Sequence, residues 1–149
     1  TAAGTECGRR LVTLHSVITN MSEPPKPVSI ELHSRSKQLE LGYESGERYF
    51  LSCEFLRVYS PSAEVLGHGP GQEVLQTGKL NVAITAIKPV GNYALQLVFD
   101  DGHDTGLYSW RYLYELCKNQ DARWQEYLTR LDKAGAHRDP DVQVVKLSL

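Results

Sequence analysis

Cysteine, methionine and long apolar runs are scarce in this chain. Its 149 residues include three cysteines and one methionine. Cys7, Cys53 and Cys117 are odd in number and widely spaced, which is typical of free thiols in a reducing compartment rather than of a disulfide framework. No apolar run approaches the roughly 20 residues that a membrane-spanning helix needs. The sequence therefore predicts a cytoplasmic protein with no membrane span.

An excess of charge of either sign is also missing. The 16 lysine and arginine residues and the 18 aspartate and glutamate residues are interspersed and give a formal net charge of -2. Binding to nucleic acid or to an anionic membrane surface would require a basic patch, so neither partner is expected. The length of the chain favours one domain with a sizeable core.

The first residues differ in character from the remainder. The single methionine, Met21, is followed by the polar, proline-bearing segment SEPPKP. We interpret residues 1–20 as an expression-derived or disordered lead and residues 21–27 as a flexible N-terminus. Residues 28–149 are then expected to form a single domain.

Apolar residues recur at every second position from residue 28 onward, which is the spacing of strands that bury one face. This alternation predicts strands around residues 30–32, 39–43, 49–51 and 82–86. The most regular row, predicted to be buried, consists of Tyr93, Leu95, Leu97 and Phe99. Gly91-Asn92 and Asp101-Gly102 flank this row and predict two tight turns, with a further strand over residues 104–108.

Helices are predicted where a capping residue precedes an apolar stripe. Ser52 caps a short helix that Pro61 ends, and Ser109 caps a longer helix. The stripe of that longer helix is Trp110, Leu113, Leu116 and Cys117. Asp121 is expected to cap a last helix that stops at Gly135. The fold class is therefore α+β: antiparallel hairpins with a short helix after the first strands and two C-terminal helices. The apolar alternation of residues 144–149 is too short to assign.

Polar side chains that can carry chemistry concentrate at residues 100–104. His103 lies there among aspartates, and an imidazole with carboxylates can hold a cation or transfer a proton. The favoured interpretation is structural, because an Asp-Gly turn needs only its backbone conformation. A serine hydrolase built from Ser60 or Ser62 with His103 and Asp104 is rejected, since the GxSxG motif is missing.

Three ordered segments resemble the gamma-butyrobetaine-hydroxylase-like N-terminal domain family. They are EFLRVYSPSAEV (54–65), VLQTGK (74–79) and KPVGNYALQLVFDDGHDTGLYSWRYLYEL (88–116). The resemblance covers residues 28–117 and includes no hydroxylase catalytic domain. It implies a small bacterial domain of unknown function. In related proteins the domain is fused to Mrp-type ATPases that handle iron–sulfur clusters, which implies an adaptor role linked to metal handling.

The resemblance also bears on metal binding. In the eukaryotic hydroxylases this domain binds zinc through a C-P-C-x-x-C segment and a histidine. The matching positions here are Ser60, Ser62, Val65 and His103. Two neutral hydroxyls and a valine cannot replace three thiolates. We therefore expect neither zinc nor another cofactor, and we expect packing between the SPSAEV segment and the DGHDTG turn in place of the zinc site.

Two hypotheses of function follow. The first is a non-enzymatic cytoplasmic interaction or adaptor domain with an unidentified protein partner, since recognition commonly uses loops on a rigid scaffold. Its predicted surface includes Ser60, Ser62, Glu64, His68 and His103. The alternative is a divalent metal site, of a kind that suits iron or manganese. Its predicted ligands are His103, Asp101 and Asp104, with His68 as a further candidate.

Overall fold

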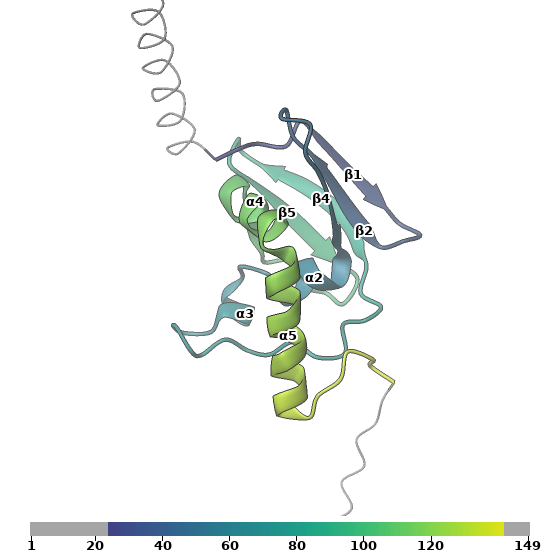
Figure 1. Ribbon diagram of the computed structural model, residues 1–149, viewed down its shortest axis with the longest axis vertical. Helices are drawn as coiled ribbons and strands as arrows, with labels where there is room; N and C mark the ends of the chain where they lie inside the picture. The colour runs from purple at the N-terminus through teal and green to yellow at the C-terminus, as the bar shows by residue number, and fades with distance from the viewer. Residues whose placement is uncertain (1–23, 142–149) are drawn as a thin grey trace, which may run out of the picture.

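The computed structural model describes residues 24–141 (Figure 1). The elements are, in order, β1 (Ser29–His33), β2 (Gln38–Gly42), β3 (Arg48–Ser52), α2 (Cys53–Val58), α3 (Ala63–Leu66), β4 (Ile84–Val90), β5 (Ala94–Phe99), β6 (Leu107–Ser109), α4 (Trp110–Lys118) and α5 (Gln120–Ala134). The strands gather at one end of the molecule, and α5 extends away from them along the long axis (Figure 1). The predictions for residues 1–20 and 144–149 lie outside the described residues.

The first sheet has the order β1-β2-β3 and is antiparallel, as the alternation predicts. Ile30 pairs with Leu41, which in turn pairs with Tyr49. One face of the sheet therefore carries apolar side chains, and these pack into the main core. Lys37 and Gly46 lie in the two connecting turns with positive φ angles of 54° and 93°. The opposite face of this sheet carries charged side chains.

The second sheet has the order β4-β5-β6 and is also antiparallel. Buried as predicted are Leu95, Leu97 and Phe99. Tyr93, predicted to belong to the same row, is instead 60% exposed. The cause is the length of the turn. Val90 pairs with Ala94, so the loop between β4 and β5 takes three residues rather than two and leaves Tyr93 outside the strand.

The last strand also differs from its prediction. A strand was expected over residues 104–108, whereas β6 begins only at Leu107. Residues 103–106 form an irregular connection in which the His103 and Thr105 side chains hydrogen-bond to serines of a distant segment. These long-range hydrogen bonds, rather than a strand ladder, position this part of the chain.

Serine hydroxyls cap three of the helices. Ser52 accepts a hydrogen bond from the Phe55 amide at the start of α2, and Ser109 accepts one from the Tyr112 amide at the start of α4. Both caps are confirmed. Ser62 plays the same role for the short helix α3. Each hydroxyl satisfies an amide that has no partner within its helix.

The start of α5 corrects the prediction made for Asp121. The helix begins at Gln120 after Asn119, whose side chain makes no capping hydrogen bond. Asp121 lies within the first turn, where a carboxylate interacts favourably with the positive end of the helix dipole. Gly135 ends α5 as predicted, in the left-handed conformation with φ 63°.

Two apolar clusters hold the fold together. The main cluster joins both sheets with α2 and α4, and the predicted stripe of α4 is buried in it. The smaller cluster holds Tyr127 and Leu131 of α5 against Val58 of α2. In the part of the chain that the structure describes, no helix is long and apolar enough to cross a membrane. The arrangement is α+β, with the corner between α2 and α3 close to α5.

Candidate functional site

The corner between α2 and α3 meets the connection from β5 to β6. Ser60 Oγ lies 2.8 Å from Nε2 of His103, and Ser62 Oγ lies 2.6 Å from Oγ1 of Thr105. Ser60 is fully buried, and the His103 side chain is only 3% exposed. We call this set of contacts the serine–histidine corner. It confirms the expected proximity of the SPSAEV segment and the DGHDTG turn.

Both ring nitrogens of His103 have partners. Nδ1 lies 2.9 Å from Oε2 of Glu64, which is at the start of α3. A carboxylate can only accept, so we assign the ring proton to Nδ1, and the hydroxyl of Ser60 donates to Nε2. Burial and the nearby charge of Arg57 lower the pKa of His103, against the opposing effect of Glu64. The imidazole is therefore held in its neutral form.

Asp101 braces the turn that carries His103. Its carboxylate accepts hydrogen bonds from Arg57 Nε at 2.8 Å, from Lys79 Nζ at 2.6 Å and from the His103 amide at 3.1 Å. Burial by itself would raise the pKa of Asp101, but these three donors together lower it to about 2. Asp101 thus links α2, the loop before β4 and the turn after β5.

Gly106 allows the two segments to approach so closely. A Cβ atom at this position would lie 2.3 Å from Ser60 Oγ. Tyr108, two residues later, is fully buried, and its hydroxyl donates to the Leu56 carbonyl of α2. The corner is therefore tightly packed as well as hydrogen-bonded.

A groove of about 380 Å³ opens beside this corner, between α3 and α5. We call it the α5 groove. Its apolar wall includes Val65 and two exposed side chains, Leu66 and Val74. Arg123 and Arg130 of α5 supply positive charge to its lining, and Glu73 and Glu126 supply an equal negative charge. Exposed aliphatic side chains beside arginines are a feature of protein interfaces more than of an ordinary surface.

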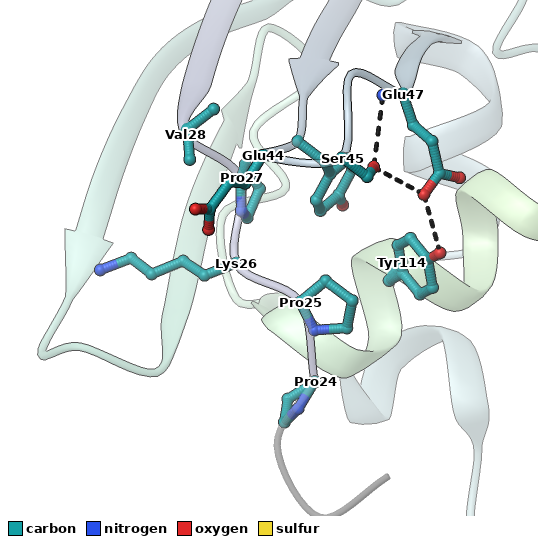
Figure 2. Close-up of a pocket in the computed structure, with 10 residues that line it drawn as sticks. Pro24, Pro25, Lys26, Pro27, Val28, Glu44, Ser45, Glu47 and Tyr114 are labelled. Carbon is teal, nitrogen blue, oxygen red and sulfur yellow. Dashed lines mark hydrogen bonds between the residues drawn. The ribbon is translucent and has the colours of Figure 1, made fainter. Parts of the chain in front are cut away.

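A second, larger cavity of about 870 Å³ lies between the N-terminal proline segment, the β2–β3 turn and α4 (Figure 2). Glu47 is the centre of its polar wall and bonds to Ser45, Tyr49, Tyr114 and Lys118. Hydrogen bonds from Tyr49 and Ser45 contribute most to lowering the pKa of Glu47 to about 2. This cavity shares no lining residue with the α5 groove. The Glu47 carboxylate therefore already has hydrogen-bond partners within the fold.

The structure buries part of the predicted interaction surface. Buried and unavailable to a partner are Ser60, Ser62 and His103. Glu64 and His68 are exposed, as the prediction requires. Sequence reasoning placed the three buried residues on a surface because polar residues in a glycine-rich context usually face solvent. Here they hydrogen-bond to one another, and that pairing makes their burial possible.

The predicted metal ligands do not converge. Asp101 is bonded to Arg57 and Lys79, and both nitrogens of His103 are engaged by Ser60 and Glu64. Asp104 makes its described contact through its backbone carbonyl, which accepts from Gln96. Among the described residues, the histidine and carboxylate atoms that gather closely enough for a cation belong instead to Glu31, His33 and Glu40.

The zinc positions implied by the family do not fit that ion here. Nε2 of His103, which would face the metal, is hydrogen-bonded to the hydroxyl of Ser60. Val65 offers no ligand atom and is buried. Zinc sites of the structural type use four strong ligands, usually thiolate or imidazole, and this set contains one. The absence of zinc stays a prediction; zinc that survives purification and depends on His103 would contradict it.

Several residues of the site were missed in the sequence. Glu64 was predicted on the surface but not as the partner of His103, and Arg57 and Arg123 were not singled out.

The cluster of Glu31, His33 and Glu40 could have been found in the sequence, since Glu31 and His33 share one strand face and Glu40 follows in the next strand. The partnership between Glu64 and His103 spans 39 positions and leaves no local signal.

Comparison with known proteins bears on the family. The model for "Gamma-butyrobetaine hydroxylase-like, N-terminal" matches residues 30–114. Two solution structures determined by NMR are 54% and 55% identical, with TM-scores of 0.72 and 0.69. They cover 85% and 86% of this chain, and 100% and 96% of their own chains.

A crystal structure from Acidithiobacillus ferrooxidans is 37% identical, with a TM-score of 0.50, over 60% of this chain and 90% of its own. It is described as a protein of unknown function in the DUF971 family. No protein of curated function matches. The sequence motifs and the match of the family model over residues 30–114 indicate the same family. The chain belongs to the gamma-butyrobetaine hydroxylase-like N-terminal domain family.

Proposed function

We propose that this chain is a non-enzymatic cytoplasmic interaction domain that binds a protein partner in the α5 groove. The observation that carries the proposal is the pair of exposed aliphatic side chains, Leu66 and Val74, beside the arginines of α5. The two aliphatic residues belong to neighbouring segments, since the Val74 amide donates to the Val65 carbonyl at 2.8 Å. The rim of the groove is thus fixed by a backbone hydrogen bond.

The serine–histidine corner supports this function by holding the groove in shape. Ser60, His103 and Glu64 are connected in the order of a hydrolase triad, with Nε2 toward the serine and Nδ1 toward the carboxylate. Ser60 is fully buried, however, so its oxygen is closed to a substrate carbonyl. We assign the three residues a bracing role, in which α3 is tied to the turn after β5.

The chemistry of the groove favours a particular partner segment. An aliphatic side chain of the partner would bury against Leu66 and Val74. Arg123 already pairs with Glu115, and the charge of Arg130 is offset by Glu73 and Glu126 in the same groove. The partner is therefore expected to carry a short apolar segment without a large net charge. The family resemblance directs the search first to proteins that handle iron–sulfur clusters.

A capture experiment with purified follow-up tests the proposal. The unaltered chain, Leu66→Glu, Arg130→Glu and a control, Tyr93→Glu, are used as baits in a lysate of the source cell. Tyr93 is also exposed but lies outside the groove. A partner lost with both groove variants and kept with the control supports the proposal, provided that the purified pair also gives chemical-shift changes at the groove. A partner retained equally by all four baits would exclude this surface.

A further inference from the structure

We propose that Glu31, His33 and Glu40 form a binding site for a divalent transition-metal ion on the outer face of the first sheet. This site lies outside the α5 groove and is independent of the proposed function. Nε2 of His33 lies 2.9 Å from a carboxylate oxygen of Glu40 and 3.9 Å from one of Glu31. All three potential ligand atoms lie within 4.8 Å of one another.

The spacing of these atoms suits a small cation. In a tetrahedral zinc centre with bonds of about 2.0–2.1 Å, two ligand atoms are separated by roughly 3.3 Å. The two measured separations from His33 Nε2, 2.9 Å and 3.9 Å, lie on either side of that value. Completing the geometry requires the exposed Glu31 side chain to rotate inward and the His33–Glu40 separation to widen by a few tenths of an ångström. Water would supply the fourth ligand, as in zinc sites that have three protein ligands.

The register of the sheet gives an independent reason to expect a cation. Glu31 of β1 and Glu40 of β2 are direct cross-strand partners. Like charges directly opposite each other in a sheet are destabilising. Arg48 of β3 already offsets the charge of Glu40 from one side, whereas the described contact of Glu31 is with His33 at 3.9 Å, so a cation between the two carboxylates would offset the repulsion that remains. Places where a sequence breaks a local rule are candidate functional sites. His33 is two positions along β1 on the same face, where its ring meets both glutamates.

The surrounding side chains hold two of the three ligands in place. The Glu40 side chain is only 9% exposed, and its second oxygen is bonded to Arg48 of β3. The ring of His33 packs against Phe50, with 6.0 Å between the ring centres. Metal-binding carboxylates and imidazoles are commonly oriented by such outer contacts. Arg48 also competes with the metal through its charge, so we expect affinity in the micromolar range rather than tight structural binding.

Bound metal would replace the proton that Nε2 of His33 donates to the Glu40 carboxylate. Nε2 must present its lone pair to the ion, so the ring proton moves to Nδ1 or leaves to solvent. The two carboxylates balance the charge of a divalent ion. One imidazole and two carboxylates suit zinc, cobalt and iron(II). Zinc is the probe of choice, because it has no redox chemistry and accepts tetrahedral geometry.

Calorimetric titration of the full chain with zinc tests the site. All proteins carry Cys7→Ser and His15→Gln, because cysteine and histidine are residue types that bind zinc. We expect one zinc per chain, and Glu31→Gln and His33→Gln should each weaken binding at least about tenfold. Glu64→Gln and His68→Gln, which alter a different histidine–glutamate pair and a different histidine, serve as matched controls and should leave binding unchanged. Arg48→Gln should tighten it.

The proposal is overturned if zinc up to about 100 µM does not bind, well above the micromolar affinity expected, or if Glu31→Gln and His33→Gln bind as the parent does. Glu31→Gln is the sharpest variant, since this exposed side chain touches His33 only at 3.9 Å and contributes little to folding. Circular dichroism establishes that each variant folds. Should one fail to fold, cobalt broadening of the amide signals of β1 and β2 in the parent protein supports the site, and broadening elsewhere refutes it.

Discussion

Two histidine–glutamate pairs in this protein have the same contact distance, but the histidine is the buried partner in one pair and the glutamate is the more buried partner in the other. His103 lies 2.9 Å from Glu64, and His33 lies 2.9 Å from Glu40. The His103 side chain is 3% exposed and joins segments 39 positions apart. The His33 side chain is 41% exposed, and its partner is seven positions away in a hairpin. The imidazole of the first pair is therefore enclosed by the fold, whereas the imidazole of the second pair can be reached from solvent.

The comparison shows that a contact distance does not reveal what a pair does. In the buried pair, the second ring nitrogen is held by Ser60, and breaking the pair leaves polar atoms without water. In the second pair, water can replace Glu40 as the partner of the half-exposed His33 ring, and the largely buried Glu40 keeps Arg48 as a partner, so losing the histidine costs little stability. Variants that affect one pair and spare the other can test this difference.

The largest effect is expected for His103→Ala. This change removes a buried ring and leaves the Ser60 hydroxyl without its partner, so the free energy of unfolding should fall by about 2–4 kcal/mol. The matched surface variant, His33→Ala, should change it by no more than about 0.5 kcal/mol. Urea denaturation measures both. Equal losses in the two variants would remove the distinction between the pairs.

Asp101→Asn should have the next largest effect. Asn keeps the shape of the side chain but removes the charge that pairs with Arg57 and Lys79, so we expect a loss of about 1–2 kcal/mol in the free energy of unfolding. Arg48→Gln, at the surface pair, should cost less. Thermal melts compare the two variants.

The same aspartate has a distinct pH window. Because the folded-state pKa of Asp101 is about 2, below its ordinary value of 3.8, its contribution is complete above pH 3.8. It should be lost as pH falls from 3.8 to about 2. The Asn variant should therefore lack this part of the acid-induced loss of stability. An unchanged slope in that window would contradict the assignment.

A smaller, pH-dependent effect is expected from His103 itself. Its folded-state pKa is lowered from the ordinary 6.5, so the folded protein binds fewer protons than the unfolded chain just below that pH. The stabilisation is fully present above pH 6.5 and decreases as pH falls toward the folded-state pKa. Urea midpoints between pH 7.5 and pH 5 should therefore decline less steeply for His103→Asn than for the parent. If His33→Asn changes the slope and His103→Asn does not, the pH dependence does not come from His103 and the prediction is wrong.

The smallest effect is expected for Glu31→Gln without metal. Removing one of two opposed carboxylates should leave stability unchanged or raise it by at most a few tenths of a kcal/mol. Saturating zinc should stabilise the parent and not this variant, because a ligand that binds only the folded state raises its melting temperature. A clear loss of stability without zinc would show that Glu31 is a structural residue.

Much of the fold could be predicted from the sequence because local geometry is encoded locally. The alternation in β1 to β5 and the serines that cap α2 and α4 report on the conformation of the residues beside them. The exact ends of strands and helices could not be predicted in the same way. Strand pairing sets the three-residue loop that exposes Tyr93, and helix packing sets the start of α5 before Asp121. Adjacent residues do not encode either contact.

The candidate sites followed the same division. The sequence singled out His103, Ser60 and Ser62, and the family resemblance brought them together. Neither could show that they are buried or that Glu64 supplies the second partner of the imidazole. Neither drew attention to His33, which lies in an unremarkable hairpin. Burial and charge pairing are properties of the whole packed chain, and they separate two residues of the same type.

The sequence by itself determined the α+β class, the order of the strands and of the helices other than α3, and the main helix caps. Together with the family resemblance it also showed that thiolates are missing at the zinc positions. These features depend on residue type and on the spacing of neighbours. Only the tertiary structure decided that one histidine braces the core, that another faces two glutamates at the surface, and that a groove lies beside α5. The reason is physical: hydrogen bonding and desolvation act between atoms that are close in space, whatever their separation along the chain.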